Sequence, residues 1–139
     1  MCEPSLPGAT QLPDGSWIRG RGVRAPAPAG PEPTFALYLG VGYHPDWEHH
    51  RIDWPDFWLP RDPEHCALLL GRAHQHALDG GRVEIGCRSG LGRTGSAIAA
   101  LAILAGVDPR QAVRWTRQHY DSRAVETAWQ RRWVRRFHS

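Results

Sequence analysis

One segment, residues 83–104, constrains the fold of this 139-residue chain more than any other. It begins as a short β-branched run, breaks into a loop that contains Gly90 and Gly92, and continues into a series of helix-forming residues. A strand that enters a helix through a tight loop turns several backbone N–H groups toward one point, with the positive end of the helix behind them. The two glycines can adopt positive φ, which lets the loop curl around a bound anion. The segment therefore predicts an oxyanion site between a strand and a helix.

Three side chains predict that this loop is reactive as well as anion-binding. Cys87 ends the strand, and Arg93 and Thr94 follow at the entrance to the helix. A thiol among inward-facing N–H groups, close to a guanidinium and a helix N-terminus, is favoured as the thiolate, and the planar fork of Arg93 matches two phosphoryl oxygens. We expect the Thr94 hydroxyl to stabilise the sulfur as it leaves. A buried structural cysteine in a plain turn is the alternative, which the joint spacing of these residues disfavours.

Cys87 to Arg93 forms a Cys-x5-Arg motif followed by Thr94-Gly95. It resembles the phosphate-binding loop of the cysteine-dependent protein tyrosine and dual-specificity phosphatases, in particular their compact, bacterial-type members. The resemblance implies that Cys87 is the nucleophile and that Arg93 helps to bind phosphate. The family usually has His before the cysteine, where this chain has Gly86, and that His is thought to favour the thiolate. The residues expected to bind the phosphoryl group are Arg88, Ser89, Gly90, Leu91, Gly92 and Arg93.

A second motif, Trp54-Pro55-Asp56, precedes Cys87 by about thirty residues. It resembles the mobile acid loop of the tyrosine phosphatases. Pro60 falls where the longer motif also has a proline, whereas Trp58 departs from it, since Gly is common there. The resemblance implies that Asp56 protonates the leaving oxygen and then, once ionised, accepts a proton from the water that hydrolyses the phosphocysteine. A surface turn is the alternative for the tripeptide taken alone.

A third segment, residues 123–130, resembles the segment in which the family places the residues that orient this water. The resemblance implies water-positioning roles for Gln130 and Glu126. In a helix that begins near Val125, these two residues would lie one turn apart on one face. The structural alternative is a helix start with a glutamate in its first turn, where the helix dipole favours it.

Strands that alternate with helices predict an α/β layer structure. The family resemblance implies a central mixed, mostly parallel sheet flanked by helices, as in the compact dual-specificity type. Residues 1–33 are rich in proline and are expected to form a lead-in with a possible edge strand over 17–23, whereas 34–139 form the catalytic domain as a single unit. The other elements expected are strands at 35–39 and around 51–54, and helices over 62–78, 94–104, 108–119 and from about 125.

Two of these helices have a face that is predicted to be buried. The first is expected to begin at Asp62 as its N-cap. The last carries aromatic residues at i, i+4 and i+8, and we expect its tryptophans in the core rather than as platforms for nucleobases. The residues expected to be buried are Cys66, Leu69, Leu70, Ala73 and Ala77 on the first helix, and Trp129 and Trp133 on the last.

Composition limits the compartment and the partners. The three cysteines are an odd number with no paired spacing, which is typical of a reducing compartment, and residues 1–5 lack the features of a signal peptide. No apolar run approaches the length that spans a bilayer. We therefore expect a cytoplasmic protein with no membrane partner. The histidines lack ligand spacing with a matching second half, so no metal and no cofactor are expected.

The leading hypothesis is a phosphomonoester hydrolase that works through a phosphocysteine, as a protein tyrosine or dual-specificity phosphatase, with a phosphoprotein as the expected partner. Gly86 in place of His supports an alternative, a low-turnover, pseudophosphatase-like module that binds phosphate. The net charge is +3 and every cation is an arginine. An arginine stripe supports a third hypothesis, a phosphatase on 5′-phosphorylated RNA or a small phosphorylated metabolite, although a solvated helix face explains the stripe as well and nucleic acid is not the expected partner. The stripe consists of Arg131, Arg132, Arg135 and Arg136.

Overall fold

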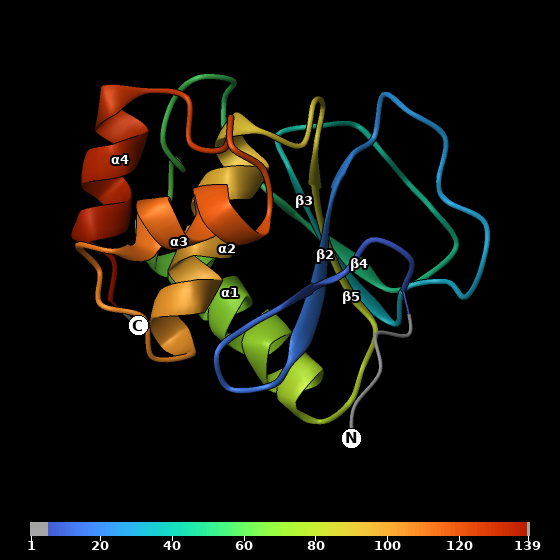
Figure 1. Ribbon diagram of the computed structural model, residues 1–139. Coiled ribbons are helices and arrows are strands. Elements are labelled where there is room, and N and C mark those ends of the chain that lie inside the picture. Colours follow the sequence, from blue (N-terminus) through green and yellow to red (C-terminus); the bar gives the residue numbers. More distant parts are fainter. Residues whose placement is uncertain (1–5, 139) are drawn as a thin grey trace.

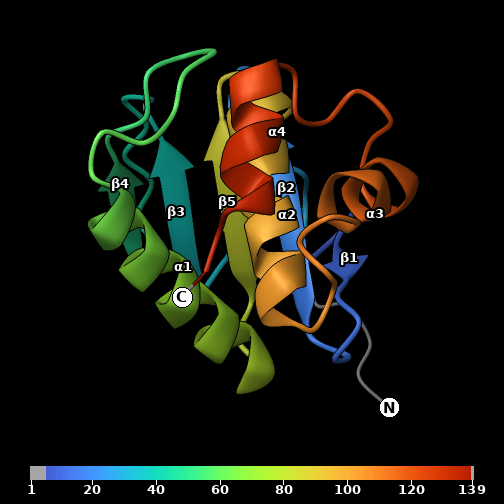
Figure 2. The same cartoon turned by 90° about the vertical axis from the view of Figure 1, so that its left-hand side faces the viewer.

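The computed structural model describes residues 6–138 and shows a five-stranded sheet with four helices on one of its faces (Figure 1, Figure 2). The strands are β1 (Thr10–Gln11), β2 (Trp17–Gly22), β3 (Phe35–Leu39), β4 (His49–Ile52) and β5 (Val83–Cys87), and the helices are α1 (Pro63–Leu78), α2 (Gly92–Leu104), α3 (Ala112–His119) and α4 (Ala128–Arg135). The strand order is β1-β2-β5-β3-β4, in which β1 is antiparallel to β2 and the other neighbours are parallel. The expected mixed, mostly parallel α/β architecture is therefore confirmed.

Strand β5 lies in the middle of the sheet, and all of its side chains are buried. Helix α2 packs against it and is apolar nearly all round, with every residue from Gly92 to Ala102 buried. The other three helices pack around α2 (Figure 2). The loop that joins β5 to α2 therefore lies where the carboxyl ends of the parallel strands meet, which is the usual place for a ligand in an open α/β sheet.

The strand expected over 17–23 forms as β2, but it is not an edge strand. The short strand β1 pairs with it antiparallel, because a turn with φ of 90° at Gly15 reverses the chain. Leu12 and Ile18 belong to the same core cluster as the side chains of α1, α2 and β5. Residues before position 34 thus contribute to the main core, and the domain boundary at 33 stays a prediction.

Helix α1 forms as expected from its sequence. The Asp62 carboxylate accepts a hydrogen bond of 3.1 Å from the His65 N–H, which confirms the predicted N-cap. Burial, and to a smaller degree the nearby Asp62 carboxylate, raise the pKa of Cys66 to about 12, so this thiol is an ordinary protonated core side chain. The buried residues of the helix are those predicted, namely Cys66, Leu69, Leu70, Ala73 and Ala77.

The last two helices begin three residues later than the sequence predicts. Residues 109–111 form a turn ahead of α3, in which the Asp108 carboxylate accepts a bond of 2.8 Å from the Arg110 N–H. Ahead of α4, Val125 has φ of 63°, which no helical residue adopts. The predicted helix start near Val125 is wrong because the N-cap is Thr127, whose side chain forms a capping box with Gln130.

The aromatic residues of α4, and Phe137 just after the helix ends, divide between the core and the surface. Trp133 packs edge-on against the buried Trp54, with ring centroids 5.1 Å apart, and Phe137 lies 5.4 Å from Trp133. Trp129 is 43% exposed, so its expected place in the core is wrong. Its ring instead lies 5.4 Å from that of Trp58, because its face of α4 points toward the segment that follows β4.

Three further features concern the part of the chain that the structure describes. None of its helices is both long and apolar enough to cross a bilayer. It contains no group of three or more His, Cys, Asp and Glu side chains that could hold a metal ion. Cys66 and Cys87 are free thiols, and Cys2 lies outside the described residues.

Candidate active site

The loop between β5 and α2 curls over the sulfur of Cys87. This residue is 1% exposed, and the backbone N–H of Gly90 donates a hydrogen bond of 3.2 Å to its Sγ. Gly90 has φ of 79°, a left-handed conformation that favours glycine. Helix α2 has no side-chain cap at its N-terminus, so the N–H groups of its first turn remain available to an anion. Of the predicted phosphate-binding residues, Gly90, Gly92 and Arg93 are buried, Leu91 is half-buried, and Arg88 and Ser89 are exposed.

The guanidinium of Arg93 is held by backbone carbonyls of two other segments. Its Nη1 donates to the carbonyl oxygens of Leu39 at 3.0 Å and Trp54 at 3.1 Å. Gly40 lies so close that an added Cβ would overlap both the Trp54 carbonyl and this Nη1. The Nε of Arg93 has no hydrogen-bond partner within residues 6–138. The side chain is thus fixed at the loop with a buried donor still available to an oxyanion.

Asp56 approaches the same guanidinium from the segment after β4. Its Oδ1 lies 3.4 Å from Arg93 Nη2 and accepts a hydrogen bond of 3.0 Å from the Phe57 N–H. The Asp56 side chain is 52% exposed, so solvent and a bound substrate can both reach it. The structure therefore brings together residues predicted from two separate motifs, since Arg93, which enters α2 after the loop that follows Cys87, lies beside the Asp56 carboxylate.

Residues 53–60, which we call the acid loop, are tethered to the first turn of α4. The Trp129 indole N–H donates a hydrogen bond to the Phe57 carbonyl, and Gln130 Nε2 donates to the Trp58 carbonyl at 3.3 Å. Within the loop, the Trp54 indole N–H also donates to the Trp58 carbonyl, at 2.7 Å. Trp129 was missed as a site residue because its spacing in the sequence indicates only a helix face.

Gln130 and Glu126 do not share a helix face, so this part of the prediction is wrong. Gln130 is fully buried, and its Oε1 accepts hydrogen bonds from the N–H groups of Glu126 and Thr127 at 3.1 and 3.2 Å. Glu126 precedes α4. Its carboxylate lies against Gly92, where an added Cβ would overlap it. Both residues border the site, Gln130 through the acid loop and Glu126 at the N-terminus of α2.

The Thr94 hydroxyl does not contact the sulfur in this structure. Thr94 is fully buried, and its Oγ1 has no hydrogen-bond partner among the residues described. The donor to Cys87 Sγ is the Gly90 N–H instead, because the left-handed turn at Gly90 directs that N–H inward. The role of Thr94 in stabilising the leaving sulfur stays a prediction.

Strand β2 supports the outer side of the loop, which the sequence analysis did not foresee. The Val23 N–H donates to the Cys87 carbonyl at 2.8 Å. A Cβ at Gly22 would lie 2.5 Å from the Ser89 carbonyl oxygen, and one at Gly20 would overlap the ring of Tyr120. Glycine has a low strand propensity, but at these two positions it lets the loop and the Tyr120 ring approach the backbone of β2. In the sequence, the alternation of Arg and Gly from Arg19 to Gly22 could have indicated that another segment approaches this strand closely.

Gly86 has a side chain from another strand beside it. A Cβ at this position would lie 3.0 Å from Tyr38 Cδ1, so the ring of Tyr38 occupies the space next to it. The Tyr38 hydroxyl donates a hydrogen bond of 2.6 Å to Glu84, a fully buried carboxylate that also pairs with Arg19 at 2.5 Å and Arg21 at 3.0 Å. Burial, followed by the bond to Glu84, raises the pKa of Tyr38. A histidine at position 86 would require this ring to move.

The fold is similar to those of solved phosphatase structures. Tk-PTP in its active form matches with a TM-score of 0.68, at 23% identity over 92% of this chain and 93% of that one. A mutant form of Tk-PTP gives a TM-score of 0.63, at 26% identity over 73% of this chain and 74% of that one. The kinase associated phosphatase (KAP), with its catalytic-site cysteine replaced by serine, gives 0.68 at 14% identity over 95% of this chain and 94% of that one. The architecture is thus that of the protein tyrosine phosphatases.

The sequence also matches the family model described as protein-tyrosine phosphatase, over residues 43–126. This range is more than half of the chain and includes both Asp56 and Cys87. The fold and the match define a cysteine-dependent phosphatase, a class of enzymes that act on phosphorylated substrates. The chain belongs to the protein-tyrosine phosphatase family.

Proposed function

We propose that this protein hydrolyses phosphomonoesters through a phosphocysteine intermediate, with the substrate range of a protein tyrosine or dual-specificity phosphatase. The observation that supports this most directly is the position of Arg93, six residues after Cys87. Its buried guanidinium lies 3.4 Å from the Asp56 carboxylate. A nucleophile, an anion-binding fork and an acid in one site are the groups that a two-step phosphoryl transfer needs.

In the first step, the Cys87 thiolate attacks phosphorus, the phosphorus–oxygen bond to the leaving group breaks, and Asp56 gives its proton to the departing oxygen. The non-bridging oxygens are bound by the N–H groups of the loop and by Arg93. These donors are already oriented before the substrate arrives, because Arg93 is fixed by the Leu39 and Trp54 carbonyls. Preorganised donors of this kind are the main source of transition-state stabilisation in such reactions.

In the second step, water attacks the phosphocysteine, Asp56 accepts a proton from this water, and orthophosphate leaves as the thiolate is restored. Thr94 stabilises the departing sulfur. Gln130 orients the water by exchanging its bond to the Trp58 carbonyl, which at 3.3 Å is the longest bond that its side chain makes. Glu126 also helps to orient this water. Its carboxylate lies against Gly92, the first residue of α2.

Exposed aromatic side chains favour an aryl phosphate on a protein over a small polar metabolite. Phe57 and Trp58 of the acid loop are 52% and 59% exposed, and Trp129 beside them is 43% exposed. Rings at the edge of a site can pack against the phenol ring of a phosphotyrosine and against peptide side chains. We therefore propose a phosphoprotein as the substrate, and the cytoplasm as the compartment because the free thiol of Cys87 requires a reducing environment.

Hydrolysis of p-nitrophenyl phosphate by the wild type and by the Cys87→Ser and Asp56→Asn variants tests the proposal. We expect no turnover for Cys87→Ser and a loss of about 10² to 10⁴ in kcat for Asp56→Asn. Asp53→Asn is the matched control, since Asp53 lies in the same loop with a 64% exposed side chain and pairs only loosely with Arg61, at 3.7 Å. Equal rates in all four proteins would contradict the proposal.

The contact between Tyr38 and Gly86 favours a second candidate, a module that binds phosphate with little turnover. Without the family's His, the thiolate relies on the Gly90 N–H and the end of α2. This candidate requires saturable vanadate binding that is lost in an Arg93→Met variant, together with negligible hydrolysis by the wild type. Measurable turnover that depends on Cys87 would eliminate it.

A further inference from the structure

A groove of about 430 Å³ lies between α3 and α4. Both helices pack against α2 (Figure 1). Six of the eight side chains that line it are arginines, three contributed by each of these two regions. Only three of the four arginines in the predicted stripe belong to it, because Arg136 lines a different groove. We call this surface the arginine groove. Its lining consists of Arg110, Arg114, Arg117, Arg131, Arg132 and Arg135, with Val113 and Ala128.

The charge of the arginine groove is not compensated within the described part of the chain. No carboxylate lines it, and among the described residues Arg117 is the only one of its arginines whose side chain makes a hydrogen bond, to the Ala124 and Val125 carbonyls at 2.9 and 2.8 Å. Residues 107–139 hold eight of the 17 arginines and three of the 14 acidic residues, so the rest of the chain is slightly acidic. Clustered cations repel one another, and folding here brings them together without partners. The arrangement therefore points to an external anion.

The geometry of the groove restricts the kind of anion. Helices of eight residues are about 12 Å long, so six guanidinium groups face a short, narrow space. Guanidinium forks bind phosphoryl oxygens in pairs, and this density suits a compact ligand with several phosphoryl groups. No aromatic ring lines the groove, since Trp129 packs on the acid loop and Trp115 stacks on His119 at 4.4 Å. It therefore lacks the platforms on which nucleobases stack.

We propose that the arginine groove is a second anion site, which binds a compact ligand that carries two or more phosphoryl groups. The ligand can be a free oligophosphate or a multiply phosphorylated lipid headgroup. The site contains neither Cys87, Arg93 nor Asp56, so it does not depend on the proposed hydrolysis. It adjoins the catalytic loop through Arg117, which holds the Val125 carbonyl, while the Val125 N–H donates to the Leu91 carbonyl at 3.3 Å.

The test is calorimetric binding of inorganic tripolyphosphate to the full chain carrying Cys87→Ser, with orthophosphate present to occupy the phosphate-binding loop. Replacing Arg114 and Arg135 together by Gln should weaken binding about tenfold or more, since each removes charge-assisted bonds. Both side chains are exposed and neither makes a hydrogen bond or ion pair with another described residue, so the fold should be retained, which thermal unfolding will check.

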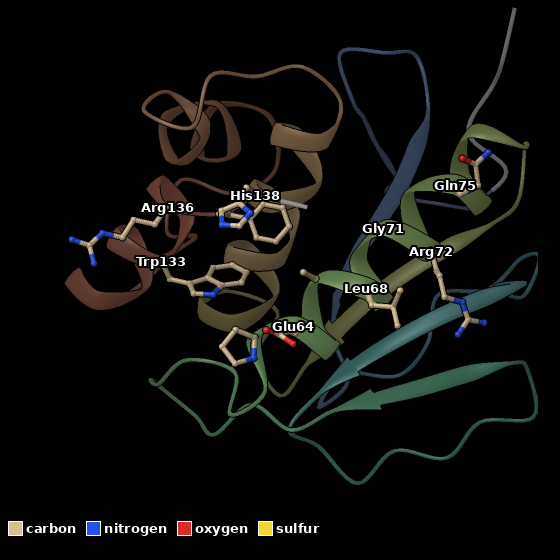
Figure 3. A pocket seen from close by; sticks show the side chains of 11 residues that line it. Glu64, Leu68, Gly71, Arg72, Gln75, Trp133, Arg136 and His138 are labelled. Atoms are coloured by element: carbon tan, nitrogen blue, oxygen red, sulfur yellow. The ribbon is translucent and has the colours of Figure 1, made fainter.

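The matched control removes the same charge outside the groove, by replacing Arg51 and Arg136 with Gln. Arg136 lines the neighbouring apolar groove between α1 and the end of α4, whose volume is about 860 Å³. Figure 3 shows it with Leu68 and Trp133. We expect this variant to bind tripolyphosphate nearly as the parent does, because a compact ligand in the arginine groove does not contact either residue. An equal loss in both double variants would overturn the proposal, since bulk charge alone would then explain binding.

Vesicles with and without a bisphosphorylated inositol lipid distinguish the two sources of the ligand. The ligand is a lipid headgroup if the protein sediments with the vesicles that contain this lipid and only the Arg114 and Arg135 double variant fails to do so. Tripolyphosphate binding without sedimentation identifies a free anion. Absence of both kinds of binding would overturn the proposal, as would a 5′-phosphorylated RNA oligonucleotide that binds more tightly than tripolyphosphate at equal salt concentration.

Discussion

The hydroxyl of Tyr120 donates a hydrogen bond of 2.6 Å to the carbonyl oxygen of Gly90, and the N–H of the same glycine points at the sulfur of Cys87. Tyr120 comes from the end of α3, and its ring rests on Gly20 of β2. Burial, and then the charge of Cys87, raise the pKa of Tyr120, so the hydroxyl remains a donor. A side chain thirty positions away thus fixes the orientation of Gly90 in the loop between β5 and α2, which we propose binds phosphate.

Replacing Tyr120 by Phe should loosen the phosphate-binding loop and leave the rest of the fold intact. Loss of a hydrogen bond to a partly buried carbonyl costs about 1–3 kcal/mol, and we expect most of this cost to appear as weaker vanadate binding and a lower kcat/KM. Inhibition by vanadate measures the first effect and p-nitrophenyl phosphate hydrolysis the second. Unchanged vanadate affinity would show that Tyr120 does not position the loop.

Gly22→Ala should weaken phosphate binding because the new methyl group would push against the Ser89 carbonyl. Overpacking of this kind costs about 1–3 kcal/mol, which a denaturant titration and vanadate inhibition will detect together. Gly71→Ala is the matched control, since nothing lies within 4 Å of a Cβ there and α1 contains the position. Alanine in a helix interior should raise stability by about 0.5–1 kcal/mol. Similar behaviour of the two variants would contradict the packing role of Gly22.

Trp129→Phe should impair proton transfer more than phosphate binding. The substitution keeps an aromatic ring against Trp58 but removes the indole N–H that holds the Phe57 carbonyl of the acid loop. We expect a larger fall in kcat for phenyl phosphate than for p-nitrophenyl phosphate, because the poorer leaving group depends more on a positioned acid. The ratio of the two rates is the measurement, with Trp115→Phe as the control. An equal loss on both substrates would exclude this role.

Glu84→Gln should destabilise the protein strongly. The Glu84 carboxylate is fully buried and pairs with both Arg19 and Arg21, so a neutral amide would leave buried cations without compensation. Breaking such a pair from one side costs about 3–5 kcal/mol, which the midpoint of urea unfolding will report. Tyr38→Phe is the comparison, because it removes the bond that the hydroxyl donates to Glu84 and the one that it accepts from Trp47, but leaves both ion pairs in place. A smaller effect for Glu84→Gln than for Tyr38→Phe would contradict this account.

Cys66 should resist alkylation in the folded protein. Since burial raises the pKa of its thiol to about 12, the reactive thiolate forms only at strongly alkaline pH, and the side chain is fully buried as well. Iodoacetate at neutral pH should leave the peptide that contains Cys66 unlabelled, as peptide mass mapping will show. The same treatment in urea should label it. Labelling of Cys66 in the native protein would mean that α1 opens far more often than its packing implies.

Much of the fold was predictable from local signals in the sequence. Alternating β-branched residues, the glycines of the loop and the alanine-rich run after it predicted β5, the tight loop that follows it and α2. Asp62 followed by a proline predicted the start of α1. These features depend on a residue's neighbours in the chain, whose backbone preferences and hydrogen bonds are settled within a few positions.

The sequence by itself determined the family, since its match covers residues 43–126, and it predicted the chemistry, since Cys87, Arg93 and Asp56 stand in motifs that predict a phosphatase. Only the tertiary structure decided what surrounds them. Val125 leaves the helical conformation where its N–H meets the Leu91 carbonyl, and Trp129 faces the acid loop instead of the core. The arginine groove exists only because α3 and α4 pack side by side. Contacts between distant segments set these features, and the periodicity of one segment carries no information about the surface that another will present to it.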